Sequence, residues 1–121
     1  MESLTKASWI FLALIHVMPA LVLFAPSLTG RLYQTAPTGE IGLLIVHRGA
    51  LFLAVVAACI FAILDPSVRR PLSCIVEISV IGFLFVYLRG GMPEGALRTI
   101  ALVDLVALAP LAFVTFRAWT D

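Results

Sequence analysis

The chain has 121 residues, of which 62% are hydrophobic and 12% are charged, where about 25% charged is usual for a soluble domain. A soluble domain of this length could not bury so much apolar surface, so we expect one integral membrane domain, residues 1–121, with lipid as its solvent. Eight Lys and Arg balance seven Asp and Glu, which gives no reason to expect a nucleic-acid partner. The two cysteines form no CxxC pair, and no cofactor or metal motif is found.

Four mostly apolar stretches follow one another along the chain: residues 8–26, 41–64, 71–88 and 96–119. Each is close to the roughly 20 residues that a helix needs to cross a bilayer. The segments between them are rich in Pro and Gly, and Asp65-Pro66 suits a capped turn. Short connections favour antiparallel neighbours, so the sequence predicts an all-α, four-transmembrane-helix bundle with up-down-up-down topology.

The first stretch follows Lys6 and so resembles a signal peptide. Its length and its internal His16 and Pro19 indicate instead a retained span. One face of the predicted bundle carries four basic residues and the other carries three: Lys6, Arg69, Arg70 and Arg117 against Arg31, Arg89 and Arg98. The positive-inside rule therefore favours cytoplasmic termini. Trp9 and Trp119 are expected in an aromatic belt at that face.

Ionisable residues interrupt the apolar spans at five positions: His16, His47, Arg48, Glu77 and Asp104. An Arg or Asp at the centre of a membrane helix costs roughly 2.5–3.5 kcal/mol, and such residues usually face the bundle interior. Pairing between them is the expected way to offset that cost.

Depth in the membrane predicts two pairs. Arg48 lies seven residues into the second stretch and Asp104 eight into the fourth, so both are about 10–12 Å from one face. We expect them to form a direct or water-bridged ion pair, with either a structural or a functional role. His16 and Glu77 lie about 9–12 Å from the opposite face, and we expect a hydrogen bond between them, direct or through one water.

His47 begins a stripe of small residues, Ala50, Ala54, Ala58 and Ala62, which favours close packing of helices. Haem ligation by His47 and His16 is an alternative, although their depths differ by about 6 Å. Pro19 and Pro110 lie within spans beside charged positions, which fits either room in the core or the general frequency of proline in membrane helices.

The segment HRGALFLAVVAACIFAILDPSVRR, with the later ALRTIALVDL, resembles the small DoxX-like four-helix membrane proteins of an uncharacterised branch. The resemblance rests on Arg48-Gly49, the Asp65-Pro66 turn with Arg69-Arg70, and Asp104. It implies a four-helix bundle in a bacterial membrane, most simply the inner membrane. Some relatives are tied to quinol oxidation, but no catalytic residue carries over to this sequence.

Together these features favour a small membrane protein with a polar intramembrane site for an apolar or lipid-like ligand. In an enzyme, His16 and Glu77 would be the acid–base pair acting on an isoprenoid, a sterol-like ring or a quinone. Arg48, Asp104 and His47 would bind the ligand. Two alternatives remain open: an accessory subunit of a larger membrane complex, and a homo-oligomeric transporter.

Overall fold

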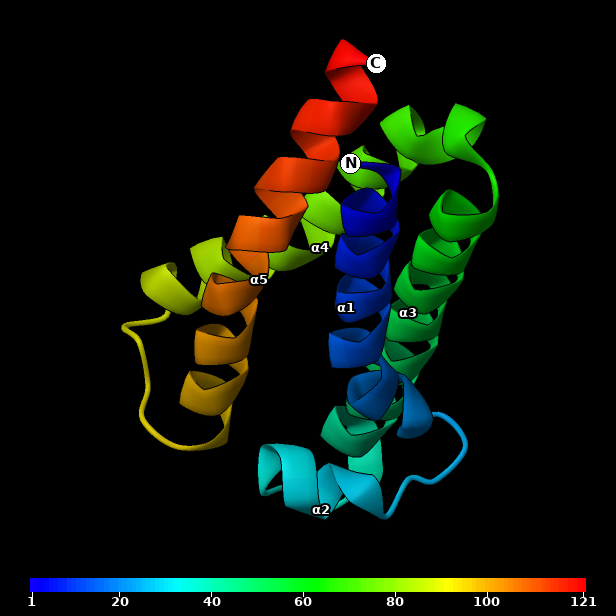
Figure 1. The fold of residues 1–121 in the computed structure, drawn as a ribbon. Helices are drawn as coiled ribbons and strands as arrows, with labels where there is room; N and C mark the ends of the chain where they lie inside the picture. The colour runs from blue at the N-terminus through cyan, green and yellow to red at the C-terminus, as the bar shows by residue number, and fades with distance from the viewer.

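Four long helices run alternately up and down in the computed structural model, which describes residues 1–121 (Figure 1). They are α1 (Glu2–Leu21), α3 (Gly39–Leu64), α4 (Arg69–Arg89) and α5 (Ala96–Thr120). Each belongs to a segment long and apolar enough to cross a membrane. The expected all-α four-helix bundle is confirmed, and the chain is a small membrane protein. Both chain ends lie at the same end of the bundle, here called the terminal end (Figure 1).

Two short elements complete the chain. The helix α2 (Leu28–Tyr33) lies across the opposite end of the bundle, here called the α2 end (Figure 1). The 3₁₀ turn η1 (Pro66–Val68) joins α3 to α4 with Asp65 as its N-cap and Pro66 at its first position. The Oδ1 atom of Asp65 accepts hydrogen bonds from the hydroxyl and the amide of Ser67, which hold the pKa of Asp65 below its ordinary value.

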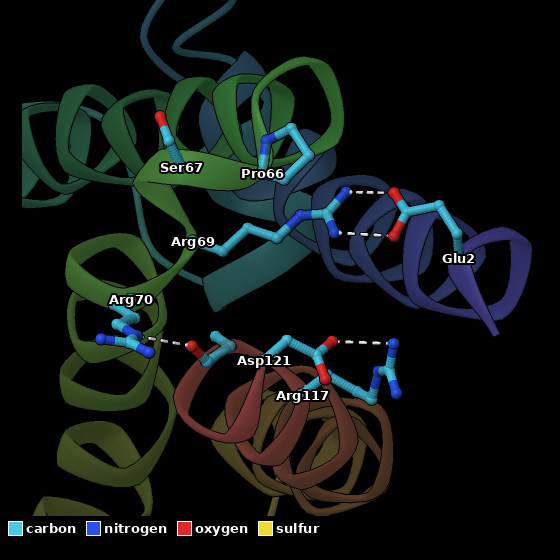
Figure 2. Close-up of a pocket in the computed structure, with 8 residues that line it drawn as sticks. Glu2, Pro66, Ser67, Arg69, Arg70, Arg117 and Asp121 are labelled. Carbon is cyan, nitrogen blue, oxygen red and sulfur yellow. Dashed lines mark hydrogen bonds and ion pairs between the residues drawn. The ribbon is translucent and has the colours of Figure 1, made fainter.

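The first helix differs most from the sequence prediction. It begins at Glu2, six residues before the predicted span, and ends at Leu21, shortly after Pro19. Its polar start is held by Arg69, whose Nη1 and Nη2 atoms donate to the two Glu2 carboxylate oxygens at 3.0 and 2.6 Å (Figure 2). The Arg69 Nε atom also donates to the Ala62 carbonyl at 2.8 Å, in the last turn of α3.

The neighbouring Arg70 holds a third helix at the same end. Its Nε atom donates to the Ala118 carbonyl at 2.9 Å, near the end of α5 (Figure 2). The first two residues of α4 thus tie together the start of α1 and the ends of α3 and α5.

The core is formed mainly where α1 packs on α3 and α4 packs on α5, with α1 also lying against α5. Trp9 is fully buried in this core, so its predicted place in an aromatic belt is wrong. Trp119 is 56% exposed near the terminal end, which fits its predicted place in the aromatic belt. The predicted small-residue stripe also needs correction: Ala58 and Ala62 are buried, whereas His47 and Ala54 are exposed.

Gly49 on α3 lies close against the last turn of α1 and the residues that follow it. A Cβ atom at this position would lie 2.8 Å from the Leu23 backbone nitrogen and 3.3 Å from the Pro19 carbonyl oxygen. No side chain fits there unless the backbone at the end of α1 moves. Gly49, the neighbour of Arg48, therefore lets α3 approach the end of α1, and Ala58 and Ala62 of the stripe are buried further along α3.

Gly49→Ala is expected to lower the free energy of unfolding by about 1–3 kcal/mol, because the added methyl group overlaps the α1 backbone. Gly82→Ala is the matched control. A Cβ atom at Gly82 meets no atom within 4 Å, so this change should stabilise the mid-helix position by about 0.5–1 kcal/mol. Denaturant unfolding of both variants in detergent micelles, followed by circular dichroism, measures the difference. Equal effects of the two substitutions would contradict the close packing at Gly49.

Candidate functional site

The observed start of α1 changes the level at which His16 lies. His16 is fourteen residues beyond Glu2, or about 21 Å from the terminal end, and Asp104 is sixteen residues before Thr120, or about 24 Å from the same end. Glu77 is eight residues beyond Arg69, or about 12 Å from that end. His16 therefore shares its level with Asp104, and not with Glu77 as predicted.

His16 and Asp104 line one partly open cavity of about 160 Å³ between α1, α2, α3 and α5. His16 is 2% exposed and Asp104 is 8% exposed. The Phe52 ring forms another wall, and Pro19 lies beside His16 in the lining, so the sequence prediction of room near Pro19 is confirmed. The remaining lining is largely aliphatic, which makes the two ionisable side chains the main polar features of the cavity.

The hydrogen bonding of His16 fixes its tautomer. Its Nδ1 atom lies 2.7 Å from the Leu12 carbonyl oxygen. A carbonyl oxygen only accepts, so Nδ1 carries the hydrogen and the neutral ring leaves Nε2 as an acceptor. Nε2 is buried and has no hydrogen-bond partner in the protein. Asp104 has no ion pair within 4.0 Å. The cavity thus presents a free imidazole acceptor and a free carboxyl group.

Arg48 is surrounded by aromatic rings instead of pairing with a carboxylate. Its guanidinium carbon lies 4.8 Å from the centre of the Phe52 ring, 5.1 Å from Phe83 and 5.9 Å from Tyr33. Rings at these distances attract the cation through their quadrupoles. The predicted direct ion pair with Asp104 is not formed. The Phe52 ring lies against Arg48 and also against the His16 ring, at 5.7 Å between centres.

Glu77 has a partner on another helix. The hydroxyl of Thr115 donates to its Oε1 atom at 2.7 Å, so the predicted direct hydrogen bond to His16 is not formed. Both residues line a shallow hollow between α4 and α5, apart from the His16–Asp104 cavity. Thr115 was missed by the sequence analysis, although it lies five residues before the end of α5, at a level near that of Glu77. His47 is exposed on α3 and does not join His16 at the cavity.

A second, strongly polar cleft of about 430 Å³ lies at the terminal end (Figure 2). Its arginines already have partners within the protein. Arg69 binds Glu2, Arg70 binds the Ala118 carbonyl, and Arg117 pairs with Asp121 at 2.7 Å. We therefore assign this cleft to holding the helix ends together.

No group of three His, Cys, Asp or Glu side chains lies close enough to hold a metal ion, and Cys59 and Cys74 are free thiols. No protein-family model matches the chain, and neither curated proteins nor solved structures give a match.

Double-mutant cycles can measure whether Glu77 interacts with Thr115, as observed, or with His16, as predicted from the sequence. Glu77→Leu combined with Thr115→Val should show a coupling of about 1 kcal/mol in unfolding, because the two side chains share a hydrogen bond. Glu77→Leu combined with His16→Leu should be additive within about 0.5 kcal/mol, because the two side chains belong to separate sites. Coupling of Glu77 with His16, and none with Thr115, would contradict the observed hydrogen bond and support the pair predicted from the sequence.

Proposed function

We propose that this membrane protein binds a hydroxyl-bearing ring of an apolar ligand in the His16–Asp104 cavity, and that His16 exchanges a proton with it. The proposal is supported by two buried ionisable side chains that line the same cavity. Neither of them has an ionic partner in the protein. Ionisable residues inside a membrane bundle usually mark functional sites, because their cost must be offset by something.

The size of the cavity limits which ligands can bind. A cavity of about 150 Å³ in a protein core accommodates benzene, so the volume here, about 160 Å³, suits one six-membered ring. The fused rings of a sterol need more space. A quinone or quinol ring with an isoprenoid tail fits the dimensions, with the ring in the cavity and the tail among the helices or in lipid.

The hydrogen-bonding groups favour the reduced, hydroxyl form. A ligand hydroxyl would donate to the free Nε2 atom of His16, while the Leu12 carbonyl holds Nδ1–H in place. Transfer of the hydroxyl proton to Nε2 gives an imidazolium and a ligand oxyanion. The Asp104 carboxylate, in the same cavity, would stabilise that imidazolium. His16 is then the general base and Asp104 its electrostatic partner, in place of the predicted His16–Glu77 pair.

The orientation of the bundle in the membrane is inferred from the distribution of its basic residues. Lys6, Arg69, Arg70 and Arg117 belong to the terminal end, so we propose that this end faces the cytoplasm. A bacterial inner membrane fits the proposed kinship with DoxX-like proteins. The accessory-subunit and transporter interpretations stay as alternatives, and neither accounts for a buried Nε2 atom without a partner on a residue that lines a ring-sized cavity.

The test is calorimetric titration of the detergent-solubilised protein with a short-chain benzoquinol and with its dimethyl ether, which keeps the ring but donates no hydrogen bond. The quinol should bind about tenfold more tightly than the ether. His16→Leu should remove that difference, while Glu77→Gln, a change outside the cavity, should keep it. Equal binding of quinol and ether by the wild-type protein would refute the proposal.

A further inference from the structure

Arg48 is a cation inside the membrane that makes no direct ion pair with a carboxylate of the protein. No carboxylate lies within 4.0 Å of its guanidinium group, and its Nε atom is buried without a hydrogen-bond partner. The three aromatic rings offset part of the cost of burying the charge, at about 0.5–2 kcal/mol for each ring. No hydrogen bond joins Arg48 to any of the three rings, and its Nε atom has no partner elsewhere in the protein.

An apolar groove of about 660 Å³ leads away from Arg48 between α3 and α4. Nine of its twelve lining residues are hydrophobic, and many are well exposed, including Leu51, Ile75, Ile78 and Val86. In a membrane-spanning bundle such a face meets the acyl chains of the bilayer. From Val86 to Ile75 the groove follows α4 for about 16 Å, which is long enough for much of one acyl chain.

Arg48 lies nearer the α2 end than any other α3 residue that lines this groove. It is nine residues beyond Gly39, or about 14 Å along α3 from the α2 end, and its side chain reaches toward Tyr33 on α2. Long basic side chains extend in this way to the membrane interface. A planar guanidinium binds phosphate oxygens with two parallel hydrogen bonds, which an ammonium group cannot do.

We propose that this groove binds an anionic phospholipid, with its phosphate on Arg48 and one acyl chain between α3 and α4. Charge complementarity favours a lipid with net negative charge over a zwitterionic one, because no carboxylate pairs with Arg48 to receive a choline ammonium. The groove is separate from the His16–Asp104 cavity, since Arg48 does not line that cavity and Phe52 stands between the two. The proposal is therefore independent of the quinol-type site.

Native mass spectrometry of the purified protein, titrated with phosphatidylglycerol or with phosphatidylcholine of the same acyl chains, measures the preference. The wild-type protein should bind phosphatidylglycerol about tenfold more tightly. Arg48→Gln should weaken that binding about tenfold, down to the level of phosphatidylcholine. Arg31→Gln removes an exposed charge on α2 and is the matched control, with a change below about twofold.

Gly82→Leu tests the acyl-chain half of the site while leaving Arg48 intact. Gly82 lines the groove with open space at its Cβ position, so a leucine fills the groove without moving the backbone. Gly82→Leu should weaken the binding of both lipids. It serves as the test if the Arg48→Gln variant does not fold.

Three results would overturn the proposal: equal binding of the two lipids by the wild-type protein, unchanged lipid binding by Gly82→Leu, and displacement of phosphatidylglycerol by inorganic phosphate alone.

Discussion

The ion pair between Arg69 and Glu2 sets the register of α1 against the rest of the bundle. Arg69 is 7% exposed and is held on a second side by the Ala62 carbonyl, so its position is fixed by α3 as well as by α4. A helix whose first turn is anchored places every later residue at a set height. With the start of α1 held there and its buried face packed in the core, His16 lies at the level of Asp104, and both side chains line one cavity.

The ionisable groups within the membrane are stabilised in three different ways. Arg48 rests among aromatic rings, Glu77 accepts a hydrogen bond from Thr115, and His16 uses one ring nitrogen on the Leu12 carbonyl. The second nitrogen of His16 is buried without a hydrogen-bond partner, and His16 and Asp104 both line the cavity. Two of the buried polar atoms without a partner, His16 Nε2 and Arg48 Nε, belong to residues that line the cavity and the groove, and both places suit ligands that lipid can deliver.

Hydropathy predicted the bounds of α3, α4 and α5 within two residues, because the edges of these helices coincide with changes from apolar to polar sequence. The start of α1 was misplaced because residues 2–7 are polar and are held by Arg69, a contact that no local pattern reveals. Equal depth also proved insufficient to identify pairs. Arg48 and Asp104 share a level, but Arg48 faces the α3–α4 groove and Asp104 faces α1, and direction depends on packing, such as the contact of Gly49 with α1.

Cysteine crosslinking tests the register of α1 most directly. In a background of Cys59→Ala and Cys74→Ala, a short thiol-reactive crosslinker is applied to His16→Cys with Asp104→Cys, and separately to His16→Cys with Glu77→Cys. Peptide mass spectrometry then identifies the linked pair. We expect efficient crosslinking between positions 16 and 104 and little between 16 and 77, because the first two positions line the same cavity. Crosslinking of 16 to 77 in preference to 104 would contradict the anchoring of α1 at Glu2.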